Sequence, residues 1–175
     1  PPAPQLRGAM EKATEQAIRA GQIIRRLRDF VSRGETERRV EHLAKLIEEA
    51  SALALVGAKE HGIRVTFRLD PQADMVLADR VQIQQVLLNL MRNAVDAMVD
   101  ADRRELTVSS RALPEDFVEI AVADTGPGIA PEIAGQLFQP FVTTKREGMG
   151  VGLSISSTIV EAHGGRIWAE PNEGG

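Results

Sequence analysis

Two asparagines lie one helical turn apart in a segment with the apolar spacing of a helix. Asn89 and Asn93 share one face of the helix expected over residues 80–99, and Asp96 follows on the next turn. Asparagine is a poor helix former because its amide competes for backbone hydrogen bonds. Two of them on one face therefore indicate a bound ion or a polar ligand, although two solvated amides on an exposed stripe would fit equally well.

A carboxylate and a glycine-rich turn follow the apolar segment 117–122. Asp124-Thr125-Gly126-Pro127-Gly128 places the acid at the end of an expected strand. Such a carboxylate can accept a hydrogen bond from an exocyclic amine, and glycines let a ligand approach the backbone closely. A simple turn is the plainer interpretation of this motif taken alone.

A second glycine-rich segment opens the helix expected over residues 151–163. Gly148-Met149-Gly150-Val151-Gly152-Leu153 would present backbone N–H groups at a helix N-terminus, where phosphate binds well. Lys145 and Arg146 precede it and could neutralise phosphate charge. The motif is not the dinucleotide fingerprint, since Leu153 holds its third glycine position, and the Walker pattern is absent. A flexible loop with solvated cations is the alternative.

The elements that must position these groups do not alternate strictly between strand and helix. Apolar alternation predicts strands over 36–40, 63–69, 75–78, 106–109, 117–122 and 166–170. Helices are predicted over 43–58, 80–99 and 151–163, with Asp79 as the N-cap of the second and a long loop over 124–150. This order indicates an α+β sandwich, in which one mixed sheet carries helices on a single face.

The first segment carries a different pattern. Its apolar residues recur at spacings of four and three, which is the a/d register of a coiled coil, and Gly34 ends the helix. These residues are Leu6, Met10, Ala13, Ala17, Ala20, Ile24, Leu27 and Val31. So narrow a stripe favours a partner helix over packing on the chain's own domain.

Composition limits the chemistry further. The chain of 175 residues has no cysteine, which excludes disulfides, Cys-ligated zinc and thiol nucleophiles. A net charge of -4 argues against nucleic acid as a partner. No apolar run reaches about 18 residues, so no membrane segment is expected in this chain. The three histidines, His42, His61 and His163, are expected to be structural or solvated.

Together, in this order and spacing, the motifs resemble those of sensor histidine kinases of two-component systems. The segment 85–94 resembles the N box, 124–128 the G1 box, 138–145 the F box and 148–155 the G2 box. Within this family the chain is most similar to FixL-type and nitrogen-regulatory kinases. The resemblance implies a Bergerat, or GHKL, two-layer α/β sandwich over residues 35–175. Residues 1–34 resemble the second helix of the dimerisation and phosphotransfer hairpin.

The resemblance also implies a role for each residue of the site. Asn93 would hold Mg²⁺, Asn89 would reach the phosphates, and Asp124 would accept the adenine N6 hydrogen bond. Lys145 would close on the phosphates within a lid over residues 127–149. ATP and Mg²⁺ are thus the expected cofactors, with Asn89, Asn93 and Lys145 as catalytic residues. The other expected ATP-binding residues are Arg92, Asp96, Gly126, Gly128, Ile129, Phe138, Thr144, Gly148, Met149, Gly150, Val151, Gly152 and Leu153.

Departures from the family pattern refine these expectations. Relatives that hydrolyse ATP carry a glutamate where Asn89 stands, and a neutral amide cannot accept a proton at neutral pH, so transfer to another acceptor is favoured. Asp96 replaces a common lysine, which leaves phosphate charge to Lys145 or Arg92. No histidine here fits the phosphoacceptor motif. The acceptor His is therefore expected upstream of Pro1, and the last sheet strand is expected to be missing.

The expected function is that of a protein-histidine kinase domain. It would donate the γ-phosphate of ATP to a His on the hairpin, for onward transfer to the receiver domain of a response regulator. The full-length kinase is expected to be a homodimer, and this domain to be cytoplasmic. The alternatives are a GHKL-type ATPase, an anti-sigma-type protein-serine kinase, or a binding module with a degenerate nucleotide site.

Overall fold

The computed structural model describes residues 7–14, 16–18, 21, 37–143 and 150–172, and the chain divides into two compact units, Pro1–Thr36 and Glu37–Gly175. In the first unit every described residue from 7 to 21 is helical, and Met10, Ala13 and Ala17 of the seam are exposed. The remaining seam positions and Gly34 lie outside the described residues, so the length of this helix stays a prediction.

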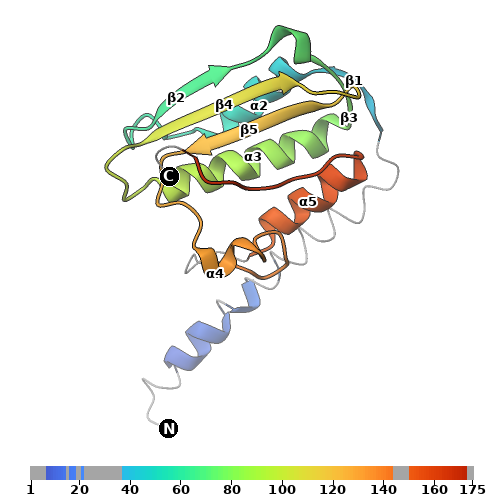
Figure 1. Cartoon of the computed structure of the whole chain (residues 1–175). Coiled ribbons are helices and arrows are strands. Elements are labelled where there is room, and N and C mark those ends of the chain that lie inside the picture. The colour runs from blue at the N-terminus through green and yellow to red at the C-terminus, as the bar shows by residue number, and fades with distance from the viewer. Residues whose placement is uncertain (1–6, 15, 19–20, 22–36, 144–149, 173–175) are drawn as a thin grey trace. The chain divides into compact units, whose positions relative to one another are not determined.

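Five strands among the described residues of the second unit form two sheets (Figure 1). The larger sheet has the order β2 (Arg64–Arg68), β4 (Glu105–Ala112), β5 (Val118–Asp124), with β2 parallel and β5 antiparallel to β4. The smaller sheet is an antiparallel ribbon of β1 (Arg39–His42) and β3 (Met75–Ala78). The larger sheet is therefore mixed, as the sequence predicts.

The long helices of this unit lie on one side of the three-stranded sheet (Figure 1). They are α2 (Leu43–Ala54), α3 (Arg80–Ala97) and α5 (Gly152–Ala162), and a short helix, α4 (Pro131–Ala134), lies between β5 and α5 in the chain. A 3₁₀ turn, η1 (Pro71–Ala73), precedes β3. This arrangement confirms the α+β sandwich.

The core lies between the sheet and the first two of these helices. Leu106 and Val108 point inward from β4 and are fully buried, and they belong to one cluster with Leu46 of α2 and Met91 of α3. Burying one such side chain contributes about 1.5–3 kcal/mol. This packing fixes the rotation of α3 about its axis, and the face that carries Asn89 is left half-buried.

Polar groups of the loops cap the first turns of α2 and α3. Asp79 Oδ1 accepts a hydrogen bond from the Gln82 amide at 3.0 Å, which confirms the predicted N-cap of α3. For α2 the cap comes from a remote residue, because Asp74 Oδ1 accepts from the Ala44 amide at 2.9 Å and Asp74 Oδ2 pairs with His42 Nδ1 at 2.7 Å. The hydrogen bond from His42 and that from Ala44 both lower the pKa of the Asp74 carboxyl.

Three sequence predictions need correction. The helix predicted over residues 43–58 is α2, which ends at Ala54, and the chain then turns at Gly57, whose φ is 78°. The first strand covers Arg39–His42 rather than 36–40, because its ladder partners are the residues of β3. Within the described chain, residues 166–170 form no strand: Ile167 alone of the five is half-buried, and they take part in no ladder with a neighbour.

Candidate functional site

The site begins where α3 meets α5. Asn89 Nδ2 donates a hydrogen bond to Ser156 Oγ at 3.0 Å, which joins the two helices. Asn89 also lies directly over Gly152, because a Cβ built on that glycine would be 2.5 Å from Asn89 Oδ1. The amide is thus packed against the first turn of α5 and is not a solvated side chain, which removes the plainer interpretation of this residue.

The other predicted residues of α3 extend along the same part of the helix. Asn93 is half-buried one turn beyond Asn89, whereas Arg92 and Asp96 are exposed. The helix ends at Ala97, against the turn that follows β5. The two asparagines therefore lie on α3, and the Asp124 turn lies beside the end of that helix.

The Asp124 turn is held by its own carboxylate. Asp124 is the last residue of β5, and its Oδ1 accepts a hydrogen bond from the Gly126 amide at 2.8 Å. Gly126 is buried, and a Cβ there would lie 3.0 Å from both Cβ and O of Ala97. Gly128 is exposed with φ 76°, a conformation that side chains other than glycine rarely adopt. Asp124 Oδ2 keeps capacity to accept a further hydrogen bond.

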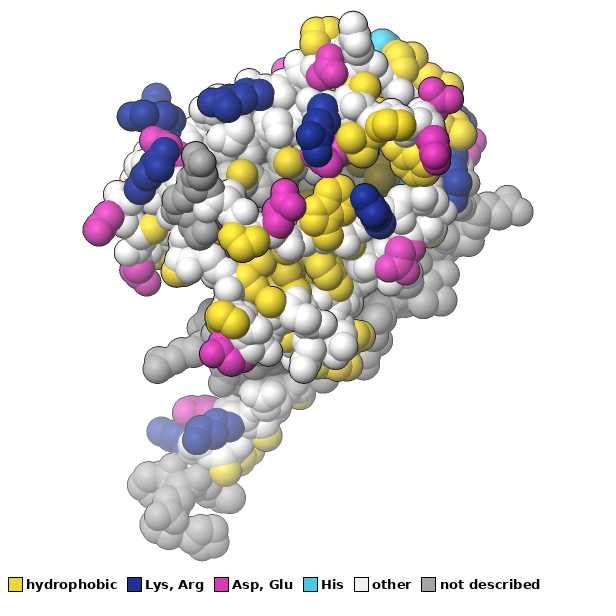
Figure 2. Space-filling view, viewed as in Figure 1, with side chains coloured by type: hydrophobic (Ala, Val, Ile, Leu, Met, Phe, Trp, Pro, Cys, Tyr) yellow, Lys and Arg dark blue, Asp and Glu magenta, His cyan; other side chains and the backbone are white. Residues whose placement is uncertain are grey.

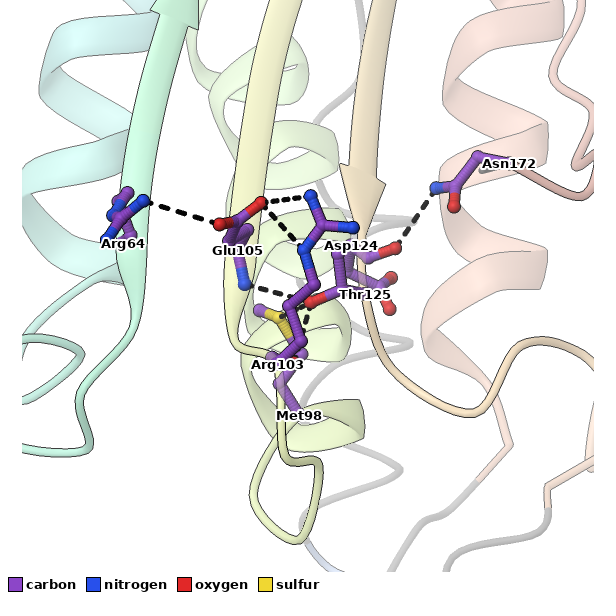
Figure 3. Close-up of polar contacts among 7 residues, drawn as sticks. All are labelled: Arg64, Met98, Arg103, Glu105, Asp124, Thr125 and Asn172. Carbon is purple, nitrogen blue, oxygen red and sulfur yellow. Dashed lines mark hydrogen bonds and ion pairs between the residues drawn. The ribbon is translucent and has the colours of Figure 1, made fainter. Parts of the chain in front are cut away.

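A threonine clamps this turn to the start of β4 (Figure 3). Thr125 Oγ1 accepts from the Glu105 amide at 2.9 Å and donates to the Arg103 carbonyl at 2.7 Å. From the other side, Asn172 Nδ2 donates to the Asp124 carbonyl at 3.0 Å. The backbone on both sides of the Asp124 carboxylate is therefore fixed.

Two ion pairs share the Glu105 carboxylate at the start of β4 (Figure 3). The Glu105 carboxylate accepts from Arg103 Nε at 3.0 Å and from Arg64 Nη1 at 3.5 Å. The Arg103 hydrogen bond is the main reason that the pKa of Glu105 lies below its usual value. Glu105 thus joins Arg103 to Arg64 of the neighbouring strand β2.

Of the predicted lid over residues 127–149, the structure describes residues 127–143, and Gly150 follows the lid in the chain. The Phe141 amide donates to the Gly150 carbonyl at 2.7 Å, and a Cβ on Gly150, whose φ is 66°, would lie 2.6 Å from the Phe141 carbonyl carbon. Phe138 is half-buried, Ile129 is exposed and Val151 is buried. The predicted residues Thr144, Lys145, Gly148 and Met149 lie outside the described residues. The F-box and G2-box segments therefore meet at Gly150.

The two ends of α5 differ in how they are held. At its N-terminus the N-cap Val151 makes no side-chain cap bond, and the first-turn residues Gly152 and Leu153 are half-buried. At the C-terminal end, His163 Nε2 accepts from the Asp79 amide at 3.0 Å while Nδ1 bonds the Ile159 carbonyl at 2.8 Å. Arg38 Nη2 also donates to the Ala162 carbonyl. Helix N-termini attract anions, so the uncapped end is the one suited to phosphate.

The surface around the strands is partly apolar. Figure 2 shows hydrophobic side chains gathered between the sheet and α4, with lysines and arginines spread over the sheet side. Ile129 and Phe141 are among the exposed large hydrophobic residues of the chain. An exposed apolar surface of this kind suits the packing of a planar ring.

Comparison with known proteins identifies the family. Residues 78–175 match the family described as histidine kinase-, DNA gyrase B-, and HSP90-like ATPase. Over 175 residues, which is 100% of this chain, the sequence is 60% identical to the sensor protein FixL of Bradyrhizobium diazoefficiens. The solved catalytic domain of histidine kinase ThkA is 35% identical, with a TM-score of 0.70 over 79% of this chain and 90% of that one. The chain belongs to the histidine kinases.

Other findings describe how this kinase domain relates to longer proteins. It spans 35% of the length of the FixL relative. Histidine kinase ThkA in complex with response regulator TrrA is 28% identical, with a TM-score of 0.74 over 99% of this chain and 49% of that one. Among the described residues, no helix of the kinase domain has the length and apolar character needed to cross a bilayer.

The donor set of the kinase site suits Mg²⁺. Mg²⁺ prefers oxygen ligands and retains several waters, so amide oxygens together with substrate phosphates are sufficient. Asn89 offers such an oxygen beside the first turn of α5, packed against Gly152, and half-buried Asn93 offers another one turn further along α3. No group of three or more His, Cys, Asp or Glu positioned to hold a metal occurs in the part of the chain that the structure describes.

Three residues of the site were not predicted from the sequence. Ser156 bonds Asn89, Thr125 clamps the Asp124 turn, and Asn172 holds the Asp124 carbonyl. Only Ser156 had a usable signal, because it is a polar residue in the helical register of buried Ile159 and half-buried His163. Thr125 and Asn172 act through contacts between distant segments that no local pattern indicates.

Proposed function

We propose that this domain binds Mg·ATP and donates the γ-phosphate to a histidine of the full-length kinase. The base would contact the Asp124 turn, and the phosphates would lie between Asn89, Asn93 and the first turn of α5. The observation that carries this proposal is the position of Asn89, whose amide lies over the uncapped N-terminus of α5. Membership of the ATPase family supports ATP as the nucleotide.

At the base end, a carboxylate fixed on both sides favours recognition of an exocyclic amine. The Asp124 backbone is held by Asn172, and the turn that follows it is held by Thr125, so Oδ2 is presented with little freedom. A hydrogen bond to a charged acceptor contributes about 1.5–3 kcal/mol. Adenine N6 is the amine that this acceptor would recognise.

At the phosphate end, the residues favour transfer over hydrolysis. The amides of α5 would bind the phosphate oxygens, and Mg²⁺ would neutralise the charge that develops there. Asn89 occupies the position of the water-activating glutamate of hydrolytic relatives, and a neutral amide does not accept a proton. Lys145, with Thr144, Gly148 and Met149, is proposed to complete the site.

The acceptor histidine is proposed to lie elsewhere in the full-length protein. His163 has both ring nitrogens in hydrogen bonds that tie α5 to the start of α3, so it is not free to accept a phosphoryl group. His42 Nδ1 bonds Asp74 and His61 Nδ1 bonds the Gly57 carbonyl. The FixL relative is nearly three times as long as this chain, which leaves room for the hairpin that carries the acceptor.

The partners follow from the same proposal. The exposed heptad residues of the first unit, such as Met10, support a helix hairpin that pairs two copies of the kinase. A response regulator receiver domain would take the phosphoryl group from the hairpin, as the complex of ThkA with TrrA suggests for this family. The need for ATP supports a cytoplasmic location for the domain.

A labelling experiment tests the transfer reaction. This chain incubated with γ-labelled ATP and Mg²⁺ should remain unlabelled, and a longer chain that adds the predicted hairpin should acquire acid-labile label when mixed with it. Acid-labile label on His42, His61 or His163 would contradict the proposal. Steady phosphate release by this chain alone, abolished in Asn89→Ala, would favour an ATPase instead.

A binding experiment tests the base contact. Asp124→Asn should weaken ATP binding by about tenfold or more, because it replaces one acceptor oxygen by a donor. Asp116→Asn is the matched control: Asp116 is exposed at the β4–β5 turn with φ 59°, which asparagine tolerates well. Equal ATP affinity for both variants, measured by titration calorimetry, would contradict the assignment of Asp124.

A further inference from the structure

Ser156 is a buried hydroxyl of α5. The residue is 2% exposed and lies on the face of α5 that meets α3, together with Ile159, which is 1% exposed. Serine is a weak helix former and loses its water when buried, so the site must return a hydrogen bond. That bond comes from Asn89 Nδ2, 67 residues earlier in the chain, at 3.0 Å.

This hydrogen bond holds the plane of the Asn89 amide, and in the structure the amide nitrogen faces Ser156. An asparagine amide has a donor end and an acceptor end of nearly the same shape, so packing alone does not distinguish them. Because Ser156 Oγ receives Nδ2, the oxygen is directed to Gly152: a Cβ built on Gly152 would lie 2.5 Å from Oδ1 but 3.2 Å from Nδ2. The oxygen therefore lies beside the uncapped first turn of α5.

The orientation matters for the chemistry of the proposed site. A carbonyl oxygen can bind Mg²⁺ or one of its waters, whereas an amide NH₂ presents only hydrogens and repels a cation. We infer that Ser156 is a positioning residue, which holds Asn89 with its oxygen toward the metal and phosphates of Mg·ATP. This inference rests on the proposed function of the domain, and it assigns to Ser156 a role that acts through Asn89 and not through direct contact with nucleotide.

The neighbouring serine provides a matched control. Ser157 is half-buried on the same helix, and its Oγ donates to Glu161 Oε1 at 2.8 Å, within α5 and away from Asn89. Ser156→Ala and Ser157→Ala each remove one hydroxyl, keep nearly the same volume and improve helix propensity equally. A difference between them therefore reports the contact with Asn89.

Calorimetric titration of the chain with ATP, in the presence of Mg²⁺ and in excess chelator, tests the inference. Ser156→Ala should weaken Mg·ATP binding by about tenfold, within the range of coupling between contacting residues, and leave metal-free ATP binding unchanged. Ser157→Ala should change neither. Equal losses with and without Mg²⁺ would indicate a merely structural role, and no loss in either condition would overturn the inference.

A double-mutant cycle separates this inference from the proposed function. In an Asn89→Ala background, Ser156→Ala should have no further effect on Mg·ATP affinity, because the side chain it positions is gone. An undiminished effect in that background would overturn the positioning role while the site assignment stands. If the unsubstituted chain fails to bind Mg·ATP at all, the proposed function and this inference both fall.

Discussion

Gly126→Ala is the sharpest test of how tightly the Asp124 turn is packed against α3. A Cβ at this position would lie 2.8 Å from Asp124 Oδ1 and 3.0 Å from the Cβ and O of Ala97. The carboxylate can rotate away, but the Ala97 atoms belong to a helix end and a side chain without rotamers. The turn must therefore move outward by several tenths of an ångström, and the bond between the Asp124 carboxylate and the residue 126 amide is lost or weakened.

The size of the effect follows from these contacts. Overpacking costs about 1–3 kcal/mol. Loss of a hydrogen bond to a charged acceptor costs about 1.5–3 kcal/mol. Replacement of a glycine returns about 0.4–1 kcal/mol through the unfolded chain. The net loss of unfolding free energy should be about 1.5–5.5 kcal/mol, or a fall of roughly 5–20 °C in the midpoint of thermal unfolding for a domain of this size.

Thermal unfolding of Gly126→Ala and of Gly135→Ala, each compared with the unsubstituted chain, measures this loss. Gly135 is the matched control, because its φ is -73° and a Cβ there would meet nothing within 4 Å. Gly135→Ala should be neutral or slightly stabilising. If the two variants differ by less than about 0.5 kcal/mol, the level at which surface changes usually fall, the close packing of the turn is refuted. ATP affinity should fall in Gly126→Ala alone.

Three further predictions concern the contacts that support the site. Thr125→Val keeps the shape of the side chain but leaves the Glu105 amide without its acceptor, so the unfolding free energy should fall by about 1–3 kcal/mol. The exposed Thr158→Val is the control and should show no comparable loss. Equal losses would contradict the clamp. The pKa of Asp74 is lowered in the folded state, so its contribution to stability is present above the ordinary value of 3.8 and disappears as the pH falls through the folded pKa. The unfolding free energy in urea, measured between pH 5 and pH 2, should therefore depend less on pH in Asp74→Asn than in Asp116→Asn. Parallel pH profiles for the two variants would contradict this account. Gln82 Oε1 is buried without a partner, and His163 accepts from the Asp79 amide, which in a capping box would donate to Gln82. Because Gln82 can accept from this amide once His163 is removed, His163→Ala should lower the unfolding free energy by roughly 1 kcal/mol less in the unsubstituted background than in Gln82→Met. Denaturant unfolding measures both losses, and strict additivity would contradict this competition.

Local patterns in the sequence predicted most of the fold. The third strand lies at Met75–Ala78 as predicted, and Asp79 caps α3 through its own side chain, because strand alternation and N-capping are properties of neighbouring residues. Residues 166–170 show where local patterns are not sufficient. Ile167 is half-buried between exposed Arg166 and Trp168, but residues 168–170 are all exposed, and a strand also requires a ladder partner, which local sequence does not reveal.

The site was predictable in its residue types and not in its contacts. Family motifs selected Asn89, Asp124 and Gly152, and the structure brings Asn89 and Gly152 together. The contact between Asn89 and Ser156 joins residues from two helices with a strand hairpin between them in the chain, and no spacing rule links them. The same applies to Asp74, which caps a helix that begins 31 residues earlier and which the sequence did not mark as important.

The parallel pairing of β2 with β4 has a consequence for how the chain folds during synthesis. β2 leaves the ribosome first, but the residues that pair with it begin only at Glu105, after the whole of α3. Until then Val65 and Phe67 have no sheet to join, and closing so long a connection is slow compared with forming a hairpin. Nascent chains that stop before β4 should therefore expose an unpaired strand edge and depend on chaperones, whereas completion of β4 and β5 should make the domain fold as one unit.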